Sequence, residues 1–523
     1  MAYQRKNVCV IGAGSSGLVV MKELKDEGHN VVSYEKYDSI GGVFYNDKSN
    51  RKAGVYDSTL LTISNYMMAF SSFPPKESER RFWTGIEYEK YLSDFVKTFD
   101  LERHIHFGSE VLNVKLEEAG KYKVSVKNLL NEELVEQEFD AIAVCSGTHR
   151  VPNYIEIKGQ ENFAGEIYHS AFYKNAEIFR GKKVLCVGLG ETGADIAHEI
   201  ACVSDKCVLS VRHLQPVVER FPFGKPHPND TYTSNCLYSP PIKAQNAFNN
   251  IMFKLIRRFV EDETAKAVAD WNIKAGDYFN HFFTKNEVFF KSVVNGTLGV
   301  NSSGIDYLER DAVVFKDGNK IKIDAIMLNT GYKDEFPFLE GIQIPDIRQL
   351  YKHSIHPDLG PNVTFIGWAR PAVGGIPACS EMQARYFALL CSNKLQLPNQ
   401  ERLLKLIARH ALYENEVYFR NPNVRTLVHY NRYMNDYASI IGCSPWSLST
   451  FLDPILTYRL WFGSQMPVIY RLKGPHCMPD TARKVIKIVP VGFHFVESVL
   501  FSLFALISRI LAMFRIIPPD PKY

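Results

Sequence analysis

The sequence predicts an α/β protein with two parallel-sheet domains and a hydrophobic helix at its C-terminus. The main observation is a glycine-rich turn, G-x-G-x-x-G, that occurs twice, each time after a short strand of Val, Ile and Cys and before a helix-like run. The turns consist of Gly12, Gly14 and Gly17, and of Gly188, Gly190 and Gly193. Such a turn brings the backbone and a helix N-terminus close to a pyrophosphate. Two Rossmann-like dinucleotide-binding domains, and therefore two dinucleotides, are expected.

Length and composition are those of a multidomain globular protein. The chain has 523 residues, too many for one hydrophobic core, and 46% of them are hydrophobic and 23% charged. A net charge of +4 gives no basis for a nucleic-acid partner. The 10 cysteines form no C-x-x-C pair, so neither a zinc site nor a dithiol redox motif is indicated, and no metal is expected. We expect reduced, mostly buried thiols in an intracellular protein.

Residues 7–35 form the first unit, a strand, a helix and a second strand that ends at Glu35. An acidic side chain at that position bonds the ribose hydroxyls of an adenosine. Gly41 and Gly42 follow, and we expect this turn to lie against the same pyrophosphate, with an ordinary loop as the alternative. Because residues 7–11 run directly into the first turn, they are interpreted as a structural strand and not as a signal peptide.

Residues 54–145 continue the domain that begins with the first glycine turn. Residues 54–75 are aromatic and irregular in period, and Met67 and Met68 are expected in the core. A helix, two hairpin-like strands and a buried strand follow up to residue 145. His104 and His106 have no third ligand nearby, so they are not interpreted as a metal pair.

The second unit has a cation where the first has an acid. A strand, the second glycine turn, a helix and another strand lead to Arg212. A cation beside the adenosine ribose favours a 2′-phosphate, so NADPH is preferred to NADH at this turn. Residues 214–300 show no clear period. A long insertion of this kind is a lid, a substrate wall or a membrane-facing surface, and the sequence leaves the three open.

The C-terminus is different in character. Residues 489–514 are almost wholly apolar and include only His494, Glu497 and Arg509 as ionisable residues. That length is enough to span a bilayer, but the ionisable residues favour a helix that lies in the interface. A buried terminal helix is the alternative.

With these residues in view, the chain resembles the flavin-containing monooxygenase family over nearly its whole length. The family's identifying motif matches a set of residues just before the second turn, namely Phe163, Gly165, His169, Tyr173 and Lys174. Residues 328–332 (LNTGY) look like the family's A-T-G-Y element, and residues 381–385 (EMQAR) match a late run. Related Baeyer–Villiger enzymes usually carry Trp in place of Tyr173, which favours heteroatom oxygenation.

The resemblance implies an enzyme that uses FAD and NADPH. Residues 1–165 and 331–445 would form the FAD domain, residues 166–330 the inserted NADPH domain, and residues 446–523 a C-terminal region with a membrane anchor. The reduced flavin would react with O2 to a C4a-hydroperoxide, which oxygenates a small nucleophile at an amine nitrogen or a sulfide sulfur. The implied location is the endoplasmic reticulum membrane, with the catalytic domains facing the cytosol. Whether the chain forms homo-oligomers is left open.

Two residues depart from the family's pattern. Thr62 replaces an asparagine close to the reactive face of the flavin, and Phe44 stands where similar proteins often have Trp. A hydroxyl cannot reproduce the donor and acceptor pair of an amide. We therefore expect Thr62 to be the catalytic position and more of the activated oxygen to be lost as hydrogen peroxide.

The residues expected to contact the cofactors lie in the two turns, at the ends of the following strands and in the family's motifs. They are Gly12, Gly14, Ser16, Gly17, Glu35, Lys36, Gly42, Val43, Phe44, Thr62, Asn65, Gly188, Gly190, Glu191, Thr192, Gly193, Arg212, Thr330, Gly331 and Gln383. Two alternative functions remain. One is an NADPH oxidase or a Baeyer–Villiger-type monooxygenase of the same architecture, and the other is a non-enzymatic, membrane-tethered nucleotide-binding protein.

Overall fold

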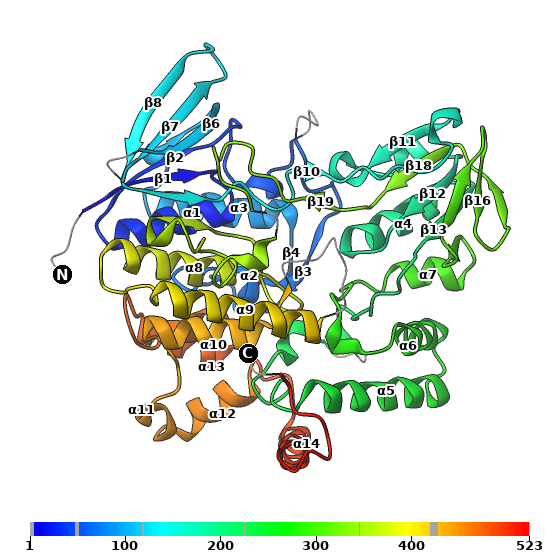
Figure 1. Ribbon diagram of the computed structural model, residues 1–523. Helices are drawn as coiled ribbons and strands as arrows, with labels where there is room; N and C mark the ends of the chain where they lie inside the picture. Colours follow the sequence, from blue (N-terminus) through cyan, green and yellow to red (C-terminus); the bar gives the residue numbers. More distant parts are fainter. Residues whose placement is uncertain are drawn as a thin grey trace.

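Two parallel sheets form the framework of the molecule. The computed structural model describes residues 5–47, 52–117, 120–222, 226–344, 346–418 and 427–521. Each sheet has five strands, and the two lie beside each other in the upper half of Figure 1. In both, the strand before a glycine turn pairs in parallel with the strand after the following helix. The two predicted strand–helix–strand units are therefore present.

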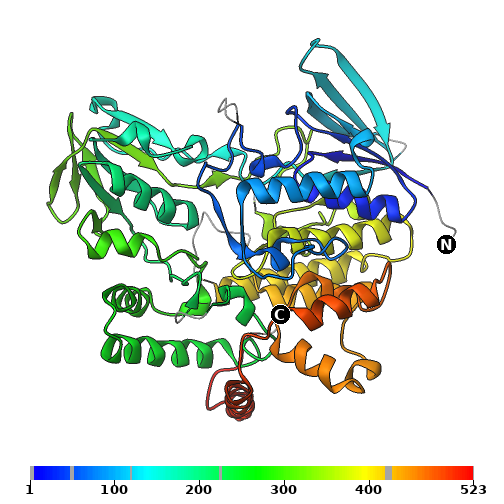
Figure 2. The same ribbon diagram turned by 180° about the vertical axis from the view of Figure 1, so that it is seen from behind.

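The first sheet has the strand order β20-β9-β1-β2-β5. Its strands are β1 (Asn7–Ile11), β2 (Asn30–Tyr34), β5 (Ile105–His106), β9 (Ala141–Val144) and β20 (Val363–Phe365). One face packs against helices, and Figure 2 shows this side: α1 (Ser15–Asp26), α3 (Gly85–Thr98) and α8 (Ile376–Cys391). The other face packs against an antiparallel sheet of β6 (Ser109–Leu116), β7 (Tyr122–Asn128) and β8 (Leu134–Phe139). Because both faces are covered, the central strands are continuous apolar runs, which is the pattern that the sequence displays.

The second sheet has the strand order β11-β18-β12-β13-β14. Its strands are β11 (Glu166–His169), β12 (Lys183–Val187), β13 (Lys206–Ser210), β14 (Leu298–Asn301) and β18 (Ala325–Leu328). Helices α4 (Glu191–Val203) and α7 (Phe289–Val294) pack on one face. A small antiparallel sheet of β15 (Ile305–Leu308), β16 (Ala312–Phe315) and β17 (Lys320–Lys322) packs on the other.

The long insertion without clear period is largely helical. It contains α5 (Ile242–Phe259), α6 (Glu263–Ala275) and α7, and α5 and α6 lie below the second sheet in Figure 1. Only the first turns of α5 are buried, whereas Ile251, Leu255 and Phe259 are exposed. Because these apolar side chains of α5 face away from the core, the sequence pattern did not identify a helix that packs on the core.

Short elements and a helical C-terminal part complete the fold. The short elements are β3 (Leu60–Ser64), α2 (Asn65–Met68), β4 (Phe82–Thr84), β10 (Val151–Pro152), β19 (Tyr332–Lys333), β21 (Arg370–Pro371) and β22 (Leu427–Val428). The helices are α9 (Gln400–Val417), α10 (Tyr430–Ile441), α11 (Leu448–Phe451), α12 (Pro454–Phe462), α13 (Pro479–Ile488) and α14 (Phe495–Met513). Met67 and Met68 are buried in the core, as predicted. Eight of the 10 cysteines are buried, and none of them forms a disulfide.

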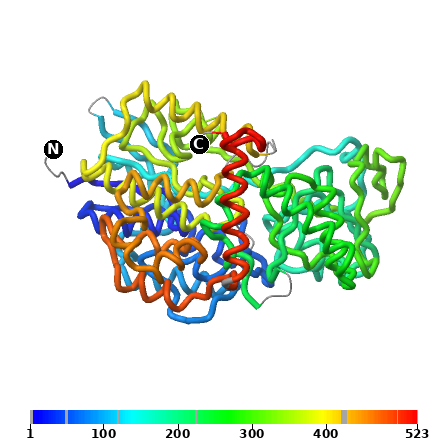
Figure 3. The backbone as a smooth tube through the Cα atoms, turned by 90° about the horizontal axis from the view of Figure 1, so that it is seen from below, coloured from blue at the N-terminus to red at the C-terminus, as the bar shows by residue number. Residues whose placement is uncertain are grey.

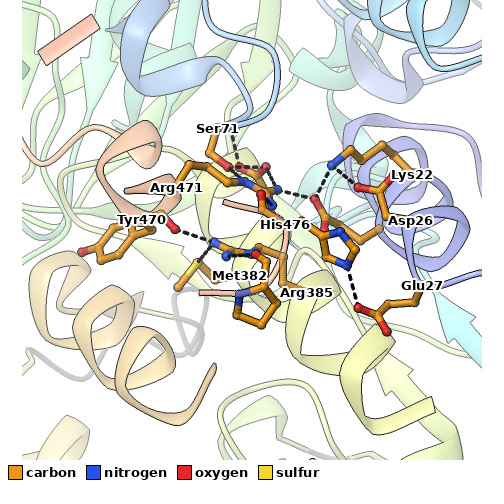
Figure 4. A network of polar contacts seen from close by, with 12 residues as sticks. Lys22, Asp26, Glu27, Ser71, Met382, Arg385, Tyr470, Arg471 and His476 are labelled. Atoms are coloured by element: carbon orange, nitrogen blue, oxygen red, sulfur yellow. Dashed lines mark hydrogen bonds and ion pairs between the residues drawn. The ribbon is translucent and has the colours of Figure 1, made fainter. Parts of the chain in front are cut away.

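A buried ionic network fixes the C-terminal part to the first domain (Figure 4). The guanidinium of Arg471 donates to Glu23 of α1, 2.5 Å away, and to Glu381 of α8, 3.1 Å away. It also donates to the hydroxyl of Ser71 at 2.6 Å. Arg471 is completely buried, so three separate parts of the chain meet in one desolvated contact.

Helix α14 lies across the underside of the molecule, where Figure 3 shows it in red. Within the described ranges, Val496–Met513 is the single helical stretch long and apolar enough to cross a membrane, with a mean hydropathy of 1.8 and 17% of it buried. Arg509 donates to the backbone carbonyl of Ser239, and the Phe501 ring packs against Phe248. The helix therefore rests along its length on the insertion.

Candidate functional site

The two glycine turns have the same local geometry. Gly12 ends β1 with φ +105°, and Gly188 ends β12 with φ +95°, values that favour glycine. A Cβ on Gly17 would stand 1.9 Å from the carbonyl oxygen of Gly12, and one on Gly193 would stand 2.6 Å from that of Gly188. In each turn only glycine permits this close approach of helix and strand.

The helices that follow the turns begin without a side-chain cap. The N-cap residues are Gly14 for α1 and Gly190 for α4, and neither helix has a side-chain cap hydrogen bond. A Cβ on Gly190 would meet no atom within 4 Å, so the backbone there is open. By contrast, α3 has a complete capping box of Thr84 and Glu87. Two uncapped helix N-termini behind glycine turns fit two phosphate groups.

The acid and the cation predicted beside the two ribose positions differ in their surroundings. Glu35 is buried, and its carboxylate accepts hydrogen bonds from the backbone N–H groups of Ala13 at 2.7 Å and Tyr37 at 3.0 Å. Burial raises the pKa of Glu35. Arg212 follows β13 and is exposed. A buried acceptor therefore stands at the first turn and an accessible cation at the second.

Four polar side chains and one aromatic ring meet where the two sheets adjoin, and we call them the junction cluster. They are Thr62, Glu191, Phe282, Lys285 and Arg370, which come from β3, the start of α4, the insertion and β21. Lys285 Nζ lies 2.6 Å from Glu191 Oε1. Thr62 lies close enough to the same carboxylate to help lower its pKa. The guanidinium of Arg370 lies over the Phe282 ring, 4.1 Å from its centroid.

The cations of the cluster keep Glu191 ionised. Burial alone would raise the pKa of Glu191, but Lys285 and Arg370 lower it below its ordinary value. His149 lies close by, and burial together with Arg370 lowers its pKa to about 4. At neutral pH the Glu191 carboxyl is therefore ionised, and the imidazole of His149 beside the cluster is uncharged.

The motif before the second turn joins the two sheets. Tyr173 donates its hydroxyl hydrogen to Glu199 of α4 at 2.6 Å, and Tyr56 donates to Asp195 of the same helix. Lys174 Nζ donates to the carbonyl oxygen of Val55 at 3.1 Å. The segment around residue 56 is thus bonded to the helix that begins at the second glycine turn, which fixes how the two turns face each other.

Further predicted residues gather around the first turn. The hydroxyl of Ser16 lies 3.1 Å from that of Ser380 on α8. A Cβ on Gly42 would stand 3.2 Å from Cα of Gly14, so the second glycine loop does lie against the first turn. Gln383 is buried and donates to the hydroxyl of Tyr433 at 2.8 Å.

Other predicted residues are engaged within the protein. Lys36 forms a largely exposed ion pair with Glu110, and the Asn65 amide donates to Glu77 Oε1 at 2.7 Å and to the Glu79 carbonyl at 2.8 Å. The structure does not bring these two side chains into the turn. The remaining predicted positions lie in loops and helix ends near the turns. The backbone carbonyl of Val43 accepts a hydrogen bond from the N–H of Val55, and the Phe44 ring packs on Tyr88. The hydroxyl of Thr330 donates to the backbone carbonyl of Asn153. Gly331 has φ +77°, and Thr192 is exposed.

Sequence reasoning missed Lys285 and Arg370. Lys285 lies in the insertion, where no pattern marked any residue. Arg370 immediately precedes a Pro in the run that leads back into the first domain, and it has no motif of its own. Lys285 pairs with Glu191, and Arg370 acts on it electrostatically, only once the chain has folded.

The fold and the site define a protein class with two glycine-turn units, each with an uncapped helix N-terminus that suits a phosphate group. A model of one family, flavin-binding monooxygenase-like, matches residues 5–489. The chain belongs to the flavin-binding monooxygenase family, and it is an oxidoreductase of the monooxygenase type that uses a flavin.

Several known proteins are similar to the chain over most of its length. It is 38% identical over 483 residues to a 4-hydroxybenzoate brominase (decarboxylating) of Marinomonas mediterranea, with 92% of each chain covered. It is also 38% identical to the enzyme of the same name from Pseudoalteromonas luteoviolacea, with 93% of each covered. A rat dimethylaniline monooxygenase (N-oxide-forming) 2 is 30% identical, with 90% of this chain and 89% of that protein covered.

A solved structure shares the fold. The S-allyl-L-cysteine S-oxygenase from Allium sativum superposes with a TM-score of 0.62 at 23% identity, over 93% of this chain and 99% of that one. The mixed α/β architecture is thereby confirmed.

Proposed function

We propose that the chain is an NADPH- and O2-dependent flavin monooxygenase with FAD at the first glycine turn and NADPH at the second. The two uncapped helix N-termini support two phosphate-bearing cofactors. Buried Glu35 suits ribose hydroxyls and would repel a 2′-phosphate, whereas exposed Arg212 would bind one. When bound and reduced by NADPH, FAD supplies an activated oxygen atom from O2 for transfer to a nucleophile.

The chain's own residues position and shield this chemistry. Tyr56 and Tyr173 hold α4 against the first domain, so the two turns keep a fixed separation. Lys285 holds the Glu191 carboxylate at the start of α4. Lys285 is only 4% exposed, so little water reaches this part of the junction.

The junction cluster supports an anionic acceptor for the oxygen atom. Two cations lie near one largely buried carboxylate, and a bromide ion or an aromatic carboxylate would gain from such a field, whereas a neutral amine or sulfide would not. Two relatives at 38% identity are named as brominases of 4-hydroxybenzoate. We infer that bromide oxidation followed by bromination of a phenolic acid is the best-supported acceptor chemistry.

The overall reaction balances without a further reagent. NADPH, O2, bromide and two protons give NADP⁺, water and hypobromous acid. Hypobromous acid then transfers bromine to a phenol ring, with release of water when hydrogen is replaced. When a carboxylate is replaced, carbon dioxide and hydroxide leave instead.

Oxygenation of an amine or a sulfide is the second candidate. The relative named as N-oxide-forming, at 30% identity, favours it. Bromide and a sulfide sulfur are both soft nucleophiles, so the same oxygen donor serves either acceptor. Only the surroundings of the acceptor differ between the two candidates.

A direct comparison of products distinguishes the candidates. The FAD-loaded full chain receives NADPH and air with 4-hydroxybenzoate and sodium bromide, or with N,N-dimethylaniline or methyl phenyl sulfide without bromide. Mass spectrometry should find a bromophenol in the first mixture and little N-oxide or sulfoxide in the others. Oxygenated amine or sulfide without bromophenol would support the second candidate, and hydrogen peroxide alone would support an NADPH oxidase.

We also propose that the chain docks on a membrane surface through α14. Its outward side chains include Val496, Leu500 and Leu506, each more than half exposed. Because the opposite side of the helix rests on the insertion, the arrangement favours a helix in the interface over a spanning one. An endoplasmic reticulum location with the catalytic domains facing the cytosol is part of this proposal, and fractionation of cells that express the chain tests it.

A further inference from the structure

Helix α4, which begins at the second glycine turn, has three acidic residues on one face. They follow each other at intervals of four residues, which places them one above the other in an α-helix: Glu191, Asp195 and Glu199. Like charges at this spacing repel each other, so the row needs partners. Those partners come from the insertion, from the segment before β3 and from the motif before the second turn.

Asp195 is the point at which three parts of the chain meet. Its Oδ2 accepts a hydrogen bond of 2.5 Å from the hydroxyl of Tyr56, in the segment just before β3. Its Oδ1 lies 3.3 Å from the guanidinium of Arg220 and also accepts from the side-chain amide of Asn286, and both of these residues belong to the insertion. The two carboxylate oxygens therefore bond different parts of the molecule.

These contacts are shielded from water. The side chain of Asp195 is 14% exposed and that of Arg220 is 9% exposed. Burial raises the pKa of Asp195, and Arg220 and the hydroxyl of Tyr56 offset part of this rise. Burial also raises the pKa of Tyr56 well above its ordinary value, so its hydroxyl keeps the hydrogen that it donates. Hydrogen bonds to a desolvated carboxylate are strong, so this contact holds α4 firmly.

The position of Asp195 lets this contact control the second nucleotide unit. Asp195 lies one turn after Glu191, the first residue of α4, and the uncapped N-terminus of the same helix suits a phosphate group. A shift of α4 would therefore move a nucleotide bound there relative to the first glycine turn. Reaction between two bound groups is sensitive to such a shift, since a misplacement of about 1 Å can slow it about 100-fold.

We propose that Asp195 is a positioning residue that sets the second nucleotide within reach of the first for hydride transfer. It does so by fixing α4 to Tyr56 on one side and to Arg220 and Asn286 on the other. This inference rests on the proposed function, in which NADPH passes a hydride with both electrons to FAD and solvent supplies the accompanying proton. It gives the insertion a role that the sequence left open, that of a clamp on α4.

Anaerobic reduction separates positioning from binding. The FAD-loaded full chain is mixed with rising concentrations of NADPH without oxygen, and the loss of flavin absorbance is followed. In Asp195→Asn and in Tyr56→Phe the limiting rate constant should fall about tenfold or more, whereas the NADPH concentration that gives half of it should change less than about twofold. Amide hydrogen exchange of residues 191–203 should become faster in both variants, and this readout does not depend on turnover.

Tyr437→Phe is the matched control. It also removes one buried tyrosine hydroxyl, which lies 3.0 Å from the hydroxyl of Ser354 and belongs to α10. Its limiting rate constant and its exchange in α4 should be those of the wild type. The double variant Tyr56→Phe/Asp195→Asn should be no slower than Asp195→Asn alone, because Tyr56 acts through Asp195. If Asp195→Asn does not fold with flavin bound, Tyr56→Phe, which keeps every charge, still decides the question.

Three results would overturn the inference. Limiting rate constants equal to that of the wild type in both variants would show that Asp195 serves the stability of the fold alone. Weaker affinity for NADPH with an unchanged limiting rate constant would assign Asp195 to binding instead of positioning. Losses that multiply in the double variant would show that Tyr56 acts independently of Asp195. A wild type whose flavin NADPH does not reduce would disprove the proposed function and this inference with it, whereas a failure of the inference alone shows only in the variants.

Discussion

At the scale of single residues, Thr62 links the departure from the family's pattern to the junction cluster. It lies beside Glu191 and helps to lower the pKa of that carboxyl, where β3 meets the start of α4. A hydroxyl offers one donor, whereas an amide has two N–H donors and an acceptor. Thr62 therefore offers a bound cofactor fewer hydrogen bonds than an asparagine would.

Replacing Thr62 by asparagine should improve the transfer of oxygen to the acceptor. In Thr62→Asn we expect about fivefold less hydrogen peroxide per NADPH consumed, because one additional hydrogen bond is worth about 1 kcal/mol. Peroxide and NADPH are measured together in the FAD-loaded enzyme. Thr62→Ser is the matched control and should behave like the wild type, and an unchanged peroxide ratio in Thr62→Asn would contradict the expectation.

Arg212 should determine the choice of coenzyme. Arg212→Ala removes the exposed cation after β13, so the apparent KM for NADPH should rise about tenfold while that for NADH stays the same. Steady-state kinetics with both coenzymes measure this difference. Bound FAD should be unaffected, and equal losses with NADPH and NADH would assign Arg212 to folding instead.

Local patterns revealed part of the site, and tertiary contacts made the rest. Both glycine turns, Glu191 and Arg212 could be predicted, because fixed spacings along the chain mark them. Lys285 and Arg370 could not, since Lys285 pairs with Glu191, and Arg370 acts on it electrostatically, only after the insertion and the returning strand fold onto the second turn. Asn65 was predicted to contact a cofactor from its position in the sequence. In the fold its side-chain amide instead donates hydrogen bonds to Glu77 and to the backbone carbonyl of Glu79.

At the scale of elements, the buried network of Arg471 holds the C-terminal part to α1 and α8. Burial alone would raise the pKa of Glu23, but the nearby Arg471 and Lys22 lower it to about 2. A carboxyl whose pKa is lower in the folded than in the unfolded state stabilises the fold above its unfolded value of about 4.3. That contribution is lost as the pH falls from about 5 to about 2.

Removing the arginine should destabilise the protein strongly at neutral pH. Arg471→Met leaves the carboxylates of Glu23 and Glu381 buried without their partner, which should lower the free energy of unfolding by about 3 to 5 kcal/mol at pH 7. Urea unfolding at several pH values measures this loss, which should shrink below about pH 4 as Glu23 becomes protonated. Arg180→Gln is the control, and the loss of its exposed ion pair with Glu177 should leave the free energy of unfolding almost unchanged. A loss independent of pH would show that Arg471 acts through packing alone.

Helices and strands could be predicted from the sequence where burial leaves a clear pattern of apolar residues. The strand–helix–strand units at both turns have continuous apolar strands, because each strand is covered on both faces. The helices of residues 214–300 escaped prediction, because their exposed apolar side chains obscure the contrast between a core side and a water side. The domain boundaries placed at residues 165, 330 and 445 stay a prediction.

At the scale of the whole molecule, exposed apolar side chains collect on one end. They come from α14, from α5 and from the short helices α11 and α12, and Figures 1 and 2 both show these elements at the bottom of the molecule. The α11–α12 region contributes Leu448, Leu452 and Ile455, each more than 60% exposed. α5 adds the cations Lys254, Arg257 and Arg258. A broad apolar surface bordered by basic residues is suited to anionic lipid headgroups.

Charges placed on the outer side of α14 should release the protein from membranes. The variant Leu500→Glu/Leu506→Glu changes two side chains that are 61% and 57% exposed, so the fold should keep its stability and its flavin. Burying each leucine in a bilayer contributes about 1.5 to 3 kcal/mol, so the loss of both should lower vesicle binding at least tenfold. Cosedimentation with vesicles of phosphatidylcholine and phosphatidylserine measures the binding. Lys115→Glu is the control for added negative charge, because Lys115 is an exposed residue of strand β6, which lies in the upper half of Figure 1, and this variant should bind like the wild type. Equal binding of the double variant and the wild type would show that α14 is not the membrane-docking element.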